Sequence, residues 1–136
     1  MIVMETVTIT SITIDVTVKV TVDEGAVLRM FIDDLYANPN IVDRECASDA
    51  ANTAYRVLAP AINGPLSSRA GFNWGRLVAE KTGNDTYTVT SPVECYPDPD
   101  EDSNTFIDRV LDAFAHLTAT TAHTEFSVAD VERTGV

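Results

Sequence analysis

The stretch ETVTITSITIDVTVKVTVD, residues 5–23, decides the fold, because it alternates apolar and polar side chains without a glycine or proline. Up to Ser11 the apolar side chains stand at odd positions, and from Ile12 onward they stand at even positions. Alternation with a period of two predicts a half-buried β-strand, and a slip of one residue turns all later side chains to the opposite face. The sequence therefore predicts one long strand with a bulge or bend near Ser11.

The predicted strand is longer than a small domain can easily cover. At about 3.3 Å per residue, its nineteen residues span about 60 Å, whereas typical strands span about 17–20 Å. A strand that extends past its own domain leaves backbone groups unpaired, and such edges aggregate or pair with another chain. We therefore expect residues 1–11 to form an arm whose Val7 and Ile9 contact a neighbouring subunit. The alternative is a bent strand shared by two halves of one sheet.

The remaining residues predict helices and further strands. Apolar residues at helical spacing predict two helices after the first strand, the second of which ends at Pro60. A β-hairpin, an acidic loop that begins at Pro92, a third helix and a last strand follow. The expected boundaries are residues 24–36 and 42–59 for the two helices, 74–81 and 86–91 for the hairpin strands, 103–117 for the third helix and 124–134 for the last strand.

These patterns together predict a single domain of the α+β class over residues 1–136. The long N-terminal strand, the hairpin and the C-terminal strand are expected to form a mostly antiparallel sheet, with three helices packed largely on one face. Apolar residues make up 45% of the chain, and this content excludes wholesale disorder.

Charge is the strongest feature of the composition. The chain has 21 acidic and 9 basic residues, a net charge of −12 and only two lysines, Lys19 and Lys81. Such a surface repels phosphates and anionic lipids, so we expect neither a membrane nor sequence-specific nucleic acid as a direct partner. Molar salt shortens the Debye length to about 3 Å and removes most of the repulsion between like charges. The composition is typical of proteins from extreme halophiles, while a high-GC bacterium or its phage and a nucleic-acid mimic stay open as alternatives.

Few side chains form a pattern that points to chemistry. Asp98, Asp100 and Asp102 are spaced like the start of a calcium loop, but the glycine and the final glutamate of such a loop are missing. They are therefore weak candidates for a metal site, and the alternative is a solvated acidic loop before a helix. The sequence has no paired Cys or His spacing, no nucleophile motif and no glycine-rich phosphate loop, so we expect no catalytic residue and no cofactor. Cys46 and Cys95 are expected to be reduced.

Phe72 and Trp74 lie in a glycine-flanked stretch before the hairpin. Aromatic side chains at such a place either cover the core or contact another subunit, because aromatic residues are enriched at interfaces. We assign both to the expected intersubunit surface, together with Val7 and Ile9.

Between residues 26 and 117, an alanine-rich helix ends in Ala59-Pro60, and a loop that contains Gly64 and Arg69 precedes the hairpin and the helix FIDRVLDAFAHL. This order of elements resembles the tail-completion, or neck, proteins of long-tailed phages and archaeal viruses. The resemblance implies a subunit of a homo-oligomeric ring at the head–tail junction or at the top of the tail. The chain departs from the family in the step after Ala-Pro and at residues 93–97, where the family favours an aromatic-Glu-aromatic-Gly segment.

The expected function is therefore structural and not enzymatic: a ring-forming component of a tailed virus particle from a halophilic host, with other virion proteins as partners. One alternative is an acidic binding module that mimics nucleic acid or inhibits a host or viral protein. Another is a small enzyme or ligand-binding domain of a halophile. The first residues lack the basic and apolar regions of a signal peptide, so we expect the protein in virions assembled in the host cytoplasm.

Overall fold

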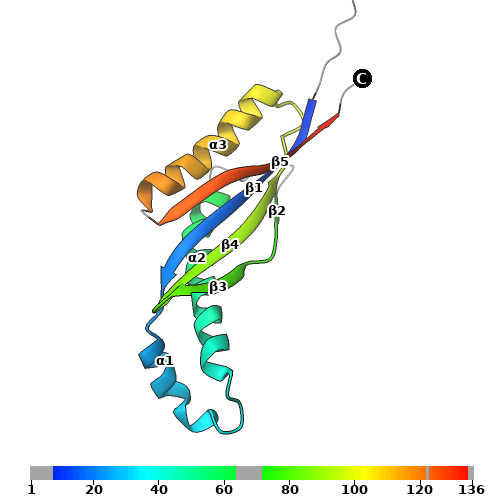
Figure 1. Cartoon of the computed structure of the whole chain (residues 1–136). Helices are drawn as coiled ribbons and strands as arrows, with labels where there is room; N and C mark the ends of the chain where they lie inside the picture. The colour runs from blue at the N-terminus through cyan, green and yellow to red at the C-terminus, as the bar shows by residue number, and fades with distance from the viewer. Residues whose placement is uncertain (1–7, 64–71, 122, 135–136) are drawn as a thin grey trace, which may run out of the picture.

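The computed structural model describes residues 8–63, 72–121 and 123–134 of the chain (Figure 1). Five strands form one antiparallel sheet, and helices pack against it, so the expected α+β class is confirmed. In chain order the elements are β1 (Thr8–Thr21), α1 (Glu24–Phe31), the 3-10 helix η1 (Ile32–Asp34), α2 (Ile41–Asn63), β2 (Phe72–Trp74), β3 (Val78–Gly83), β4 (Thr86–Cys95), α3 (Ser103–Thr120) and β5 (Thr124–Thr134).

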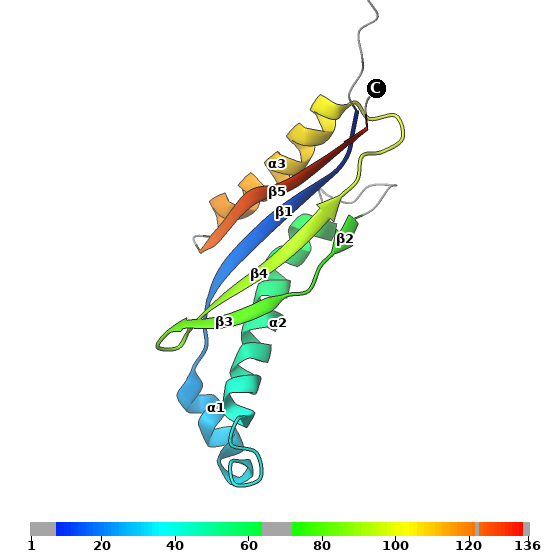
Figure 2. The ribbon, with the colours of Figure 1, turned by 45° about the vertical axis from the view of Figure 1, so that its right-hand side comes forward.

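The two central strands of the sheet are β1 and β4. Their antiparallel register pairs Ile12 with Cys95 at one end and Thr21 with Thr86 at the other. β5 pairs with the other side of β1, and the short strands β2 and β3 both pair with β4. The sheet therefore has β5 at one edge and β2 with β3 at the other (Figure 2).

The core lies between one face of this sheet and the helices α2 and α3. The even-numbered side chains of β1 from Ile12 to Val20 are all buried, as is Val22 directly after the strand, whereas the odd-numbered side chains from Thr13 to Thr21 are half-buried or exposed. This alternation follows from a strand with one apolar face. The helices complete the core with Cys46, Ala50, Ala54 and Leu58 of α2 and with Phe106, Val110, Ala113, Phe114 and Leu117 of α3.

The change of phase in β1 is a β-bulge within the chain's own sheet. The pairing of β1 with β5 shifts register between Ile9 and Ser11, so the bulge expected near Ser11 is confirmed. Beyond the bulge, Thr8 still pairs with Thr134 of the same chain. The expectation that the strand leaves its own subunit at this point is therefore wrong for residues 8–11. Residues 1–7 lie outside the described residues.

Several expected boundaries are also wrong. The hairpin strand expected over residues 74–81 is divided into β2, which ends at Trp74, and β3, which begins at Val78. α1 ends at Phe31 and continues only as the short helix η1. α2 continues through Pro60 to Asn63, because proline removes one helical hydrogen bond but does not oblige the chain to leave the helix at that residue. β4 extends through Pro92 to Cys95, although we expected a loop from Pro92 onward.

Pro92 fits into β4 because it lies opposite the break between β2 and β3. Its carbonyl oxygen accepts a hydrogen bond from the Gly75 N–H at 2.8 Å, so its nitrogen faces the same break. Proline has no N–H to donate, and no neighbouring strand lies at this break to accept a hydrogen bond from it. A Cβ atom on Gly75 would collide with the Pro92 ring and lie 3.0 Å from the Pro92 carbonyl oxygen. The absence of a side chain at Gly75 therefore allows this close approach.

Candidate interaction surface

Four exposed apolar residues lie on α1, η1 and the turn after η1, a segment that projects beyond the end of the sheet beside the first half of α2 (Figures 1 and 2). The exposed fractions are 41% for Leu28, 75% for Met30 and 57% for Ile32, and Tyr36 is fully exposed. We call these four residues the α1 patch. Leu28 and Ile32 are four residues apart and therefore share one side of this helical segment, whereas Met30 lies two residues from each and points to another side. Single exposed apolar residues are normal on protein surfaces, and the pair Leu28 and Ile32 makes this region a candidate interaction site.

The start of α1 is held by the turn between β3 and β4. The carboxylate of Asp23 caps the helix by accepting the Ala26 N–H at 3.0 Å. Asp85, whose φ is 56°, accepts the Val22 N–H through its carbonyl oxygen at 2.7 Å and the Glu24 N–H through its carboxylate at 3.2 Å. These hydrogen bonds fix the direction in which α1 leaves the sheet.

Glu24 also ties α1 to two strands through its side chain. Its carboxylate lies 2.8 Å from Nζ of Lys81 on β3 and accepts a hydrogen bond of 3.3 Å from the Tyr87 hydroxyl on β4. Burial raises the pKa of the Tyr87 phenol, so this group stays protonated and donates at neutral pH. The α1 patch is therefore presented from a helix anchored to the sheet.

The two cysteines are not poised for catalysis. Cys46 and Cys95 are both free and buried. Burial raises the pKa of the Cys46 thiol, and it raises the pKa of Cys95 to about 11. Because the thiolate is the reactive form, neither side chain is an activated nucleophile at neutral pH.

The edge strand β5 carries features that protect it from pairing with another chain. It bears Glu125, Asp130 and Glu132, which are exposed. Its register with β1 shifts a second time, between Thr13 and Ile14. Charged side chains and bulges are the usual devices that prevent edge-to-edge association. We therefore do not place the principal contact surface at this edge.

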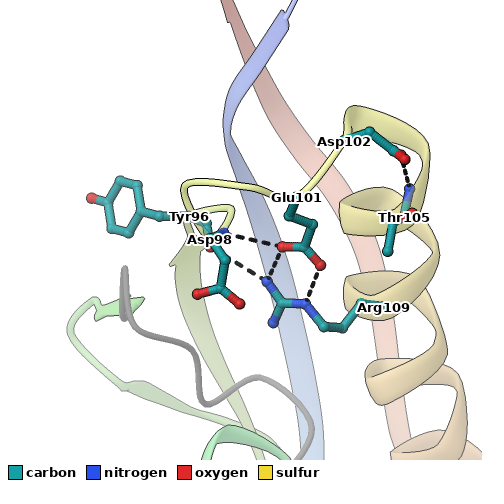
Figure 3. Close-up of polar contacts among 6 residues, drawn as sticks. All are labelled: Tyr96, Asp98, Glu101, Asp102, Thr105 and Arg109. Atoms are coloured by element: carbon teal, nitrogen blue, oxygen red, sulfur yellow. Dashed lines mark hydrogen bonds and ion pairs between the residues drawn. The ribbon is translucent and has the colours of Figure 1, made fainter.

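The acidic loop before α3 is organised around Arg109 (Figure 3). The Arg109 guanidinium binds the Glu101 carboxylate through two nitrogen atoms, Nε at 2.9 Å and Nη2 at 2.8 Å. Glu101 also accepts the Asp98 N–H at 3.1 Å, and Arg109 lies over the Phe106 ring at 5.5 Å from its centroid. Such a two-point ion pair fixes the geometry of the loop.

The structure does not gather the three aspartates that were weak candidates for a metal site. The carboxylate of Asp102 caps α3 by accepting the Thr105 N–H at 2.8 Å. Asp98 contributes its backbone N–H to Glu101, and Asp100 is exposed. Within the described ranges, no group of three His, Cys, Asp or Glu residues is placed to hold a metal ion. The loop therefore caps the N-terminus of α3, which was the alternative to a metal site.

The ion pair between Glu101 and Arg109 predicts a pH dependence of stability. The guanidinium lowers the pKa of the Glu101 carboxyl below its ordinary value of 4.5. A carboxyl group whose pKa is lowered by folding stabilises the folded state above its ordinary pKa, and this stabilisation is lost as the pH falls through the lower value. We expect the free energy of unfolding to fall less between pH 7 and about pH 3 in Glu101→Gln than in the original chain.

Urea unfolding followed by circular dichroism at a series of pH values measures this difference. The matched control is Glu125→Gln on β5, where the carboxylate is exposed. The control is expected to keep the pH dependence of the original chain. Equal pH dependence in all three proteins would contradict the role of Glu101.

Of the four residues of the expected intersubunit surface, the structure describes the side chain of one, Ile9. Ile9 lies in the core of its own chain, with 7% of its surface exposed, so it is not available to a neighbour. The backbones of Phe72 and Trp74 form the short strand β2 beside β4, and their side chains lie outside the described residues, as does Val7. None of these residues is on α1 or η1.

The sequence analysis missed the α1 patch because helical spacing of apolar residues predicts burial. Val27 and Phe31 do face α2 and are half-buried, whereas Leu28 and Ile32 share the same spacing and are exposed. The sequence did contain an indication: the eight residues of α1 include more apolar side chains than one side of so short a helix can bury.

Comparison with known proteins gives this chain no family. No protein-family model matches it. No curated protein is significantly similar to it. In the part of the chain that the structure describes, no helix is both long and apolar enough to cross a membrane.

Proposed function

We propose that this protein is a structural subunit that assembles with copies of itself into a ring, as a neck or tail-completion component of a tailed virus particle from a halophilic host. The observation that carries the proposal is the α1 patch, four exposed apolar side chains on α1, η1 and the turn that follows, a segment tied to the sheet by Glu24 and Asp85. A contact of this kind between different surfaces of identical subunits closes into a ring when the rotation allows.

The described chemistry also favours a structural role over an enzymatic one. The best-formed ionisable cluster, Glu101 with Arg109, stabilises a loop and the start of a helix. The cysteines are protonated at neutral pH because burial raises the pKa of both. The resemblance in element order to neck proteins supports the same class of function.

An acidic mimic of nucleic acid is the second candidate that the sequence left open. A mimic aligns its carboxylates on one surface in place of phosphates. The described acidic side chains are instead spread over both long helices, the acidic loop and β5, as in Asp43, Asp108 and Glu132. This distribution favours a generally acidic surface suited to high salt.

Light scattering in molar salt, followed by electron microscopy of negatively stained samples, tests the proposal. We expect a molar mass several times the 14.7 kDa of one chain and closed rings of uniform diameter. High salt is required because like charge opposes association at low ionic strength. A strict monomer at high protein concentration in molar salt would contradict the proposed function.

A further inference from the structure

We propose that the α1 patch of one subunit docks into the groove between α2 and α3 of a second copy of this chain. This inference rests on the proposed function, since it names the contact by which the ring forms. The groove has a volume of about 380 Å³ and lies between the second half of α2 and the end of α3. Its lining includes Val57, Leu117, Arg56 and His116.

The groove matches the α1 patch in polarity. Val57 and Leu117 provide an apolar floor at the boundary of the core, which suits apolar side chains such as Leu28 and Ile32. An amphipathic helix that lays its apolar side into a groove between helices is a common mode of recognition. Burial of apolar surface from both partners supplies the driving force, and molar salt removes the long-range repulsion between two acidic subunits, whereas charges in contact at an interface are screened much less.

The groove also matches the α1 patch in charge. Asp33 and Asp34 are exposed within η1, directly beside Ile32. The guanidinium of Arg56 is exposed at the groove, and none of the described residues that line it is acidic. Opposite charges at the rim of an interface direct the approach and orientation of the partners.

Two other surface grooves fit the acidic segment η1 less well. The groove beside α3 and β5 is lined by Asp108 and Asp112, and the groove between α1 and α2 is lined by Asp23, Glu45 and Asp49. Their carboxylates would face Asp33 and Asp34 of the incoming subunit, and like charges across an interface oppose binding. The groove between α2 and β3, lined in part by Arg76 and Val78, has no acidic lining residue and is therefore included in the test below.

The α1 patch of one subunit cannot reach the groove of the same subunit. α1 is anchored at the β3–β4 turn beside the first half of α2, whereas the groove begins at Arg56 in the second half (Figure 1). In the proposed arrangement, the patch and the groove of one subunit contact two different neighbours. Such a head-to-tail contact continues from subunit to subunit until a ring closes.

Mixing two blocked variants tests this arrangement. Ile32→Asp places a charge in the patch and leaves the groove intact. The second variant combines Arg56→Glu with Thr120→Trp, whose indole occupies the groove, and leaves the patch intact. All three positions are exposed, so the fold is expected to persist, and circular dichroism confirms it for each protein. Light scattering in molar salt then measures the mass of each variant alone and of the equimolar mixture.

We expect each variant alone to be monomeric and the mixture to form a complex of twice the 14.7 kDa chain, because only one intact contact remains. Assembly of the groove variant alone would overturn the inference, as would two monomers that stay separate when mixed. Loss of assembly in Val78→Asp would place the contact at the groove between α2 and β3 and would also overturn it. If the original chain assembles in any of these cases, the ring proposal survives without this contact, whereas a monomeric original chain ends both.

Discussion

Replacement of Phe114 by alanine is expected to lower the free energy of unfolding by about 3–5 kcal/mol. Phe114 is fully buried on α3, and its ring lies 5.8 Å from the ring of Phe126 on β5, measured between centroids. Removal of the ring loses its transfer free energy and leaves a cavity between α3 and the sheet, which the close-packed core fills only in part. Denaturant unfolding at one protein and salt concentration measures the change.

The matched control for Phe114→Ala is Phe31→Ala on α1. The chemical change is the same, but Phe31 is only partly buried at the contact between α1 and α2. We expect a loss of about 1 kcal/mol there, because the Phe31 ring buries less apolar area in the folded protein than the Phe114 ring does. Equal losses in the two variants would show that the core is not centred on α3 and the sheet.

Replacement of Arg109 by alanine is expected to cost about 2–3 kcal/mol. The substitution leaves the Glu101 carboxylate, whose side chain is 9% exposed, without its two-point partner. The expected cost is below that of a fully buried ion pair because the Arg109 side chain is 21% exposed. The free energy of unfolding at neutral pH measures it.

A double-mutant cycle separates the ion pair from the other contacts of Arg109. If the pair acts as a unit, Glu101→Ala combined with Arg109→Ala costs less than the sum of the two single substitutions. The control is Arg44→Ala on α2, an exposed position where a change within about 0.5 kcal/mol is expected. Additive losses in the cycle would contradict a direct interaction between Glu101 and Arg109.

The sheet was predictable from sequence because it depends on local periodicity. The alternation along β1, the turn at residues 82–85 and the last strand each carry their own signal, and the bulge near Ser11 followed from one change of phase. The path through Pro92 was not predictable, because it depends on a break between two strands that pair with the other side of β4. No local rule indicates which edge of a strand a proline nitrogen will face.

The candidate site was much less predictable than the fold. Whether Leu28 and Ile32 are buried depends on how far α1 extends past the sheet, and that distance is set by tertiary contacts of Glu24 with Lys81 and Tyr87. The pairing of Glu101 with Arg109 likewise joins a loop to a helix without a motif. The length of β1 pointed to assembly through an N-terminal arm, whereas the structure shows an exposed apolar cluster elsewhere.

The most direct test of the central claim is the sedimentation velocity of Ile32→Asp and Val78→Asp in molar salt, beside the original chain. The two side chains are almost equally exposed, at 57% and 55%, so the same charge is introduced at matched positions inside and outside the α1 patch. We predict that Ile32→Asp sediments as a monomer and that Val78→Asp sediments as the same large species as the original chain. An Ile32→Asp variant that assembles like the original chain would contradict the claim that the α1 patch holds the subunits together.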